Sequence, residues 1–168
     1  NKKNKRKKQI LEAAMQVFVQ NGFANTRMDD IVEKSGLSKG ALYHHYPSKK
    51  ELFIALIDHW EIYCFPDFYK NNKPDRSATD TLLDFSKAVL DVFDKSSFVY
   101  LAEVEFWALS NHDKQINERS KKLYRKLLNL FDLVLQKGIR LGEFKDIDTK
   151  SVSLLILSAL QGINWFCV

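Results

Sequence analysis

Hydrophobic positions recur every three to four residues along most of the chain, which is the spacing of one face of an α-helix. The first such stripe lies between Ile10 and Phe18, and Gly22 follows it where a helix is expected to stop. No segment shows the convincing period-two alternation that marks a half-buried strand. The pattern therefore predicts an all-α protein with about eight helices.

Polar breaks separate the expected helices. Residues 71–77 contain Pro74 and form the clearest internal loop. Thr26 precedes one helix, and Ser38 and Ser48 stand where N-caps are expected for the next two. The predicted helices span residues 9–20, 28–34, 39–46, 49 to about 69, 78–94, 97–110, 113–141 and 149 to the end.

Residues 26–46 have the layout of a helix-turn-helix, in which two short helices are joined by a tight turn. Gly36 supplies the positive φ that such a turn needs. Gly40 and Ala41 are small residues at the start of the second helix, where bulk would hold a recognition helix out of the major groove. The spacing alone leaves open an ordinary pair of core helices. The predicted DNA-contacting residues are Thr26, Ser38, Lys39, Gly40, Ala41, Tyr43, His44, Tyr46 and Lys50.

The net charge of +5 is unevenly distributed along the chain. Residues 1–50 hold 11 basic and 4 acidic side chains, whereas residues 51–168 hold 15 and 17. A basic head on a slightly acidic body predicts a polyanionic partner. Two alternatives stay open at this point. Residues 2–8 could serve as a solubilising segment, or the chain could be a non-enzymatic helical interaction or scaffold protein whose basic head binds acidic partners or a membrane.

Residues 9–57 carry a long and specific set of motifs. They are Ile10-Leu11-Glu12-Ala13-Ala14, Phe18, Gly22-Phe23, Thr26, Ile31-Val32, Ser35-Gly36-Leu37-Ser38-Lys39-Gly40, Leu42-Tyr43-His44-His45-Tyr46 and Ser48-Lys49-Lys50-Glu51-Leu52. Together these motifs resemble the N-terminal domain of the tetracycline-repressor (TetR) family. The departures are small, because Val32 stands where the family usually has Ala and Tyr46 stands where Phe is usual.

The resemblance implies a bacterial, cytoplasmic homodimer that binds palindromic double-stranded operator DNA, usually as a repressor, and that an unknown small molecule releases. It implies a helix-turn-helix domain at residues 1–48 and a helical ligand-binding and dimerisation domain at residues 49–168. In this family the fourth helix, here from about Lys49, moves and changes the separation of the two reading heads. The chain stops inside an apolar run, so we expect the second domain to be truncated at its C-terminus.

The second half of the chain is rich in aromatic residues, which form either a plain core or a ligand pocket between helices. Glu105 lies on the inward stripe of its helix, where a carboxylate needs a structural Arg or Lys or a ligand cation. The predicted ligand-binding residues are Phe65, Phe68, Phe98, Glu105, Trp107, Tyr124, Phe131, Gln161 and Trp165.

The last helix is apolar around much of its circumference, so more than one of its sides must be covered. Its small residues would permit close approach of another helix. A dimer contact is the preferred interpretation, and burial within one chain is the alternative. The predicted dimer residues are Leu154, Leu155, Ser158, Ala159 and Gly162.

No catalytic constellation stands out, because the chain lacks GxSxG, HExxH and a phosphate-binding glycine loop. His44 and His45 are adjacent and point to different sides of a helix, which makes them a poor metal pair. His59 and Cys64 are also poorly spaced for a shared metal. Two cysteines do not make a disulfide framework. No uncharged stretch reaches the roughly 20 residues that span a bilayer. We therefore expect no enzyme activity, metal, cofactor or membrane partner.

Overall fold

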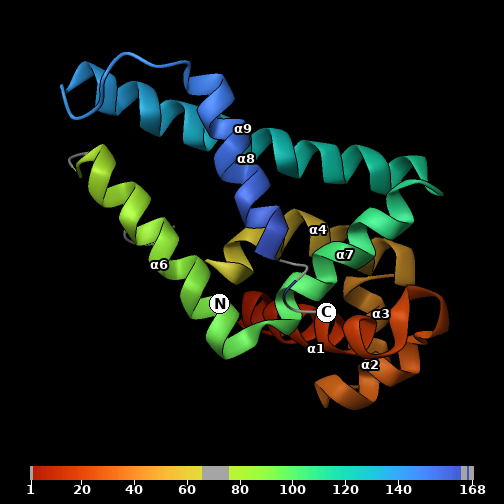
Figure 1. Ribbon diagram of the computed structural model, residues 1–168. Coiled ribbons are helices and arrows are strands. Elements are labelled where there is room, and N and C mark those ends of the chain that lie inside the picture. Colours follow the sequence, from red (N-terminus) through yellow and green to blue (C-terminus); the bar gives the residue numbers. More distant parts are fainter. Residues whose placement is uncertain (1, 66–75, 164–165, 167–168) are drawn as a thin grey trace. The chain divides into compact units, whose positions relative to one another are not determined.

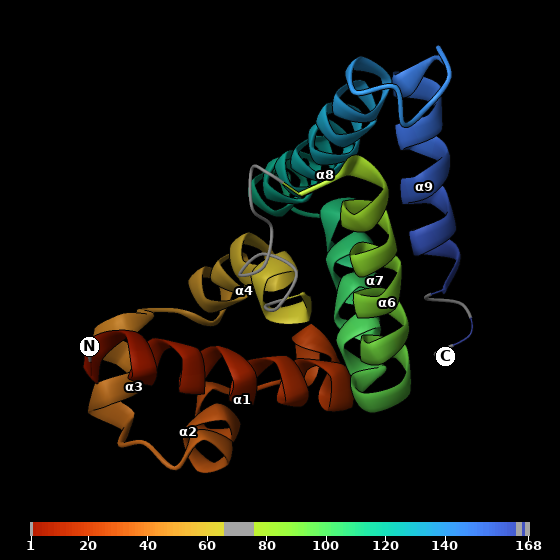
Figure 2. The same cartoon turned by 90° about the vertical axis from the view of Figure 1, so that its left-hand side faces the viewer.

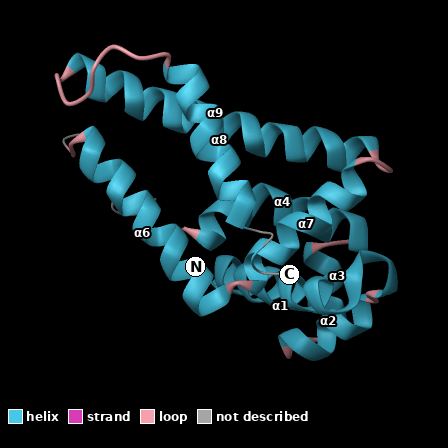
Figure 3. Ribbon diagram, in the orientation of Figure 1, coloured by secondary structure: helices cyan, strands magenta, loops and turns pink. Residues whose placement is uncertain are grey.

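The computed structural model describes residues 2–65, 76–163 and 166. These residues form helices and loops, with no strand among them (Figure 3). The prediction of an all-α fold is confirmed. The helices, labelled in Figure 1, are α1 (Lys2–Asn25), α2 (Met28–Ser35), α3 (Lys39–His45), α4 (Lys49–Cys64), α6 (Ala78–Ser96), α7 (Phe98–Ser110), α8 (Lys114–Arg140) and α9 (Thr149–Ile163).

The chain packs as two compact units. Unit 1 comprises Asn1–Trp60 and Leu101–Ser120, and unit 2 comprises Glu61–Tyr100 and Lys121–Val168. Helices α4, α7 and α8 therefore run from one unit into the other. These units are defined by packing, and the functional boundary after residue 48 stays a prediction.

Helix α1 begins earlier than the hydrophobic pattern predicts, at Lys2 rather than near residue 9. Periodicity could not reveal this first part, because residues 2–9 are all polar and the side chains of residues 4–9 are exposed. The expected stop at Gly22 is partly confirmed. Its φ of 72° and ψ of 159° interrupt the helix with a kink, although helical residues continue to Asn25.

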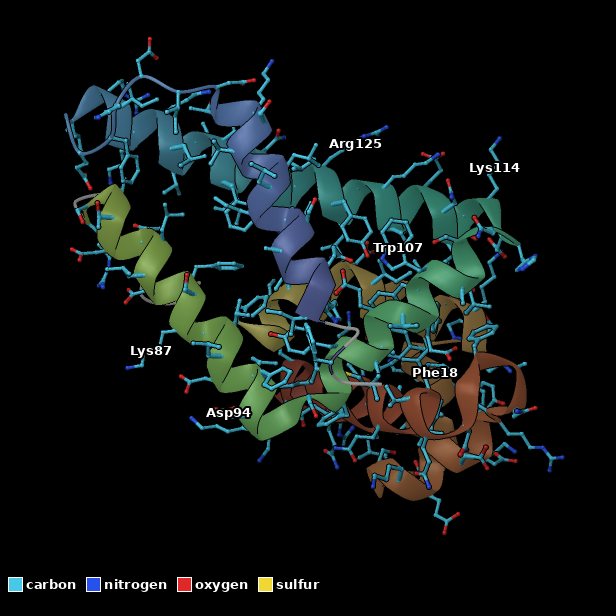
Figure 4. All side chains as sticks on the ribbon, in the orientation of Figure 1. Phe18, Lys87, Asp94, Trp107, Lys114 and Arg125 are labelled. Carbon is cyan, nitrogen blue, oxygen red and sulfur yellow. The ribbon has the colours of Figure 1, made fainter. Side chains whose placement is uncertain are left out.

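The core of unit 1 is built on aromatic side chains from three helices. Phe18 of α1 and Phe53 of α4 meet edge to face, with ring centroids 5.2 Å apart. Phe53 meets Phe106 of α7 in the same way at 5.3 Å. All three side chains are at most 1% exposed, so each contributes about 1.5–3 kcal/mol of burial free energy (Phe18 is labelled in Figure 4). These ring contacts join α1, α4 and α7 within unit 1.

Unit 2 has a separate aromatic cluster and a capped helix start. Phe85 of α6 contacts both Phe65 and Phe131, at centroid distances of 5.2 and 5.0 Å. Glu143, in the loop between α8 and α9, accepts hydrogen bonds from the backbone N–H groups of Ala78 (2.9 Å) and Thr79 (2.8 Å). These two bonds satisfy donors that the first turn of α6 would otherwise leave unpaired. The α8–α9 loop thereby holds the N-terminus of α6.

Candidate DNA-binding interface

The turn between α2 and α3 is made by Gly36, which has a φ of 65°. Its N–H donates to the carbonyl oxygens of Val32 (3.1 Å) and Glu33 (3.2 Å), which closes the C-terminus of α2. Ser38 then begins α3 as its N-cap, and its Oγ accepts from the N–H of Ala41 at 3.2 Å. Both turn residues take the roles that the sequence predicts.

Two inward side chains and one long-range hydrogen bond hold the two short helices in place. Ile31 of α2 and Leu42 of α3 are fully buried. The side-chain amide of Gln9 in α1 donates to the carbonyl oxygen of Ser35 at 2.7 Å. The end of α2 is therefore fixed against α1, directly before the turn that leads into α3.

Lys49 is a positioning residue that sequence reasoning did not identify. Its ammonium donates to the carbonyl oxygens of Phe23 (2.6 Å), Ala24 (3.1 Å) and Thr26 (2.8 Å), and it lies 4.6 Å from the centre of the Phe23 ring. These bonds join the N-terminus of α4 to the end of α1 and to Thr26, which follows it. Nothing in the sequence distinguishes Lys49 from its neighbour Lys50, so the hydrogen bonds from its ammonium to backbone carbonyl groups could not be predicted.

The outer side of α3 carries the predicted polar residues. Tyr43 is 39% exposed, and Ala41 is half-buried. Lys39 pairs with Asp29 of α2 at 2.7 Å, and this hydrogen bond raises the pKa of Lys39, which keeps it cationic. An added Cβ on Gly40 would meet nothing within 4 Å, so the start of α3 is open to a partner. The exposed members of the set are Ser38, Lys39, Gly40, Tyr43 and His44.

Two of the predicted DNA-contacting residues, Thr26 and Tyr46, are buried. Thr26 is 2% exposed, and its hydroxyl donates to the carbonyl oxygen of Gly22 at 2.8 Å. The hydroxyl proton is therefore used inside the protein, and the N-cap of α2 is Arg27 instead. Tyr46 is 7% exposed at the end of α3, and this burial raises the pKa of its hydroxyl. Both residues act here in packing.

Lys50, the last member of the predicted set, is half-buried and forms an ion pair with Asp113 at 2.7 Å. It also borders an open depression of about 600 Å³ in unit 1. The depression contains no other predicted site residue. Its lining residues are Lys50, His112, Asp113, Lys114, Gln115, Glu118 and Arg119.

The predicted ligand residues lie in both units. Phe65 and Phe131 are each 1% exposed and share contact with Phe85 in unit 2. In unit 1, Glu105 accepts a hydrogen bond from the backbone N–H of Phe23 at 3.2 Å. Trp107 is 49% exposed. Phe98, Tyr124 and Gln161 are half-buried, and Phe68 and Trp165 lie outside the described residues.

The predicted dimer residues lie on α9. Leu154 and Leu155 are 56% and 68% exposed, whereas Leu157 and Leu160 on the other side are buried. Ser158 and Ala159 are exposed and Gly162 is half-buried. Leu154 and Leu155 are thus exposed on α9 among the described residues, and the dimer contact stays a prediction.

Membrane-spanning helices and metal-binding clusters are both absent from the described residues. None of their helices is both long and apolar enough to cross a bilayer. Among these residues, no three His, Cys, Asp or Glu side chains gather in a way that could hold a metal ion.

Comparison with known proteins identifies the family. Residues 10–56 match the model of bacterial regulatory proteins of the tetR family, and residues 66–168 match the C-terminal region of QacR-like proteins. The uncharacterized HTH-type transcriptional regulator YfiR of Bacillus subtilis is 32% identical, over 96% of this chain and 79% of its own. The HTH-type transcriptional regulator QacR of Staphylococcus aureus is 26% identical, over 95% and 85%.

The fold comparison agrees. The structure of GusR from Salmonella enterica superimposes with a TM-score of 0.75 and 26% identity, over 95% of this chain and 81% of that one. The resemblance seen in the helix-turn-helix motifs thus extends through the second half of the chain. The chain belongs to the tetR family and is a DNA-binding transcriptional regulator.

Proposed function

We propose that this regulator is a homodimeric, ligand-responsive repressor that reads a palindromic operator with α3 in the major groove, one half-site for each protomer. The observation that carries the proposal is the open start of α3. Gly40 has no neighbour within 4 Å of an added Cβ, and exposed donors surround it. An α-helix enters the major groove by such an end, where small residues let the backbone approach.

The exposed side chains divide into two roles. Ser38, Lys39 and Lys50 are suited to phosphate oxygens, which fix the register of the protein on the duplex. His44 and Lys39 can meet base edges, and Tyr43 can touch a thymine methyl group. We leave the hydroxyl groups of Thr26 and Tyr46 out of this set, because Thr26 bonds to Gly22 and Tyr46 is buried.

Fluorescence anisotropy with DNA from the region flanking the gene tests this proposal. His44→Ala should weaken binding about tenfold, corresponding to about 1.4 kcal/mol of lost discrimination, and Tyr43→Ala should also weaken it. His59→Ala is the matched control, because His59 is exposed on α4 outside the proposed interface. If both α3 variants bind like the wild type, the proposed reading helix is wrong.

We propose that α9 provides the dimer contact through its exposed face. Leu154 and Leu155 are large apolar side chains left in solvent, and exposed Ser158 and Ala159 next to them permit close helix approach. Leu155→Glu should convert the dimer to monomers in sedimentation velocity. Leu83→Glu on α6 changes a side chain of similar exposure, 63% against 68%, and should leave the dimer intact.

We further propose that the effector binds among the aromatic residues of unit 2. The rings of Phe65, Phe85 and Phe131 are in contact there, and the predicted residues Phe98, Tyr124 and Gln161 of the same unit are half-buried. Effector sites in proteins are lined by apolar and aromatic side chains with a few polar groups. The effector releases DNA only if it binds the two states of the dimer with different affinity. Because the partner is operator DNA, the proposed site of action is the bacterial cytoplasm.

A further inference from the structure

The first helix starts with a run of basic residues that the matched family domain does not include. Residues 2–8 contain six Lys or Arg side chains, whereas the family match begins at residue 10. This segment, here called the basic arm, is part of helix α1. The side chains from residues 4 to 8 are exposed.

Local electrostatics oppose a helix in the basic arm. The N-terminus of a helix carries partial positive charge, which favours acidic residues, yet the first turn of α1 has none. Like charges three or four residues apart also repel each other, and Lys5 and Lys8 have this spacing. Lys8 gains a pairing with Glu12 at 3.6 Å. An anionic partner along the arm would relieve both penalties.

The position of the arm indicates which anion it meets. The residue directly after the arm is Gln9, whose side-chain amide donates to the carbonyl oxygen of Ser35. Ser38, the cap of the reading helix, follows only three residues later. Figure 2 shows α3 toward the N-terminal end of α1 within unit 1. The basic arm therefore joins the rest of α1 next to the turn between α2 and α3.

We propose that the basic arm binds the phosphate backbone of the DNA that flanks each half-site. It acts as an electrostatic clamp, which adds affinity without reading bases. The inference rests on the proposed operator binding by α3. DNA is favoured over an acidic protein or a membrane surface, because Gln9, directly after the arm, is bonded to Ser35, three residues before the cap of the proposed reading helix.

The test is the salt dependence of operator affinity for the full chain. The arm variant is Lys5→Ala with Arg6→Ala and Lys7→Ala, and alanine preserves helix propensity. The control variant removes three exposed charges of unit 2, through Lys87→Ala, Arg125→Ala and Lys145→Ala. The side chains of Lys87 and Arg125 point away from their helices in Figure 4. Circular dichroism checks that both variants fold.

The expected change is a shallower slope of log affinity against log salt, by about 0.9 for each phosphate that the arm variant no longer neutralises. Affinity for the operator and for unrelated DNA should fall in proportion, so their ratio should stay constant. Lys5→Arg with Lys7→Arg should keep the wild-type slope. Trimming the flanking base pairs should weaken the wild type and leave the arm variant unaffected.

If the arm variant shows the same slope of log affinity against log salt as the control variant, the proposed phosphate contact is wrong and the arm is a solubilising segment. Loss of binding to anionic vesicles in the arm variant, with an unchanged DNA slope, would assign the arm to a membrane surface instead. Failure of the proposed operator binding by α3 gives a different result, because the wild-type protein would then bind operator DNA and unrelated DNA with equal affinity.

Discussion

The ammonium of Lys50 lies 2.7 Å from the carboxylate of Asp113, which ties a proposed phosphate-binding cation to the start of α8. Asp113 has a second role, because its other oxygen accepts from the N–H groups of Gln115 (2.9 Å) and Ile116 (3.2 Å). The hydrogen bond from Lys50 lowers the pKa of Asp113, so the pair is ionised at neutral pH. DNA phosphate and Asp113 therefore compete for one cation.

Asp113→Asn should tighten operator binding a few-fold at low salt. An asparagine keeps the helix cap and removes the charge that holds Lys50. Asp148→Asn is the matched control, because Asp148 caps α9 through the N–H groups of Lys150 and Ser151 without facing Lys50. Anisotropy measures both variants. Unchanged or weaker DNA binding by Asp113→Asn would show that the two anions do not compete.

Glu105 and Phe23 provide a second prediction. Glu105→Ala leaves a part-buried backbone N–H without its acceptor, so urea unfolding should show a loss of about 1–3 kcal/mol. Glu105→Gln keeps an acceptor oxygen and should retain most of the stability. If Glu105 serves a cationic effector instead, both variants should stay stable and both should lose effector release.

Two glycines of the helix-turn-helix should separate folding from DNA binding. Gly36 has a φ of 65°, so Gly36→Ala should lower the free energy of unfolding by about 1–2 kcal/mol. Gly40 lies in α3 with open space around it, so Gly40→Ala should not destabilise the fold. Its new methyl group should nevertheless hold α3 away from the groove and weaken operator binding. Equal DNA affinity for Gly40→Ala and the wild type would place this end of α3 outside the interface.

Acid should weaken unit 2 through Glu143. The hydrogen bond from the backbone N–H of Thr79 lowers the pKa of Glu143 below its ordinary value of 4.5, and the bond from the N–H of Ala78 has the next largest effect. A carboxyl with a lowered pKa stabilises the fold above that ordinary value, and the contribution is lost as pH falls through the folded pKa. Glu143→Gln should therefore melt earlier than the wild type at pH 7. A melting difference that does not shrink below pH 4.5 would contradict this role.

The sequence pattern predicted the features that depend on local rules. Gly36 and Ser38 take their roles because a positive φ and an N-cap are set by neighbouring residues. The buried face of Ile31 and Leu42 follows from helical period alone. The sequence also suggested that one apolar side of α9 needs a further contact, because a helix that is apolar on several sides must be covered on more than one of them.

The features that sequence reasoning missed depend on contacts between distant residues. The amide that binds Glu105 belongs to Phe23, 82 positions away, so no spacing rule could pair them. Lys49 looked like Lys50, yet its charge is used by three carbonyl groups inside unit 1. The hydrogen bond from the Thr26 hydroxyl to the carbonyl oxygen of Gly22 was not predicted either, and the expected phosphate contact of Thr26 stays a prediction.

Selection of binding sites from a random DNA library by the full-length chain tests the central claim most directly. A homodimer that reads DNA with two copies of α3 should enrich an inverted repeat. The half-site centres should be one helical turn, or about 34–36 Å, apart, or a multiple of that distance. The Tyr43→Ala and His44→Ala variants should lose this enrichment. Enrichment of no motif, or of a single asymmetric site that survives both substitutions, would contradict the account.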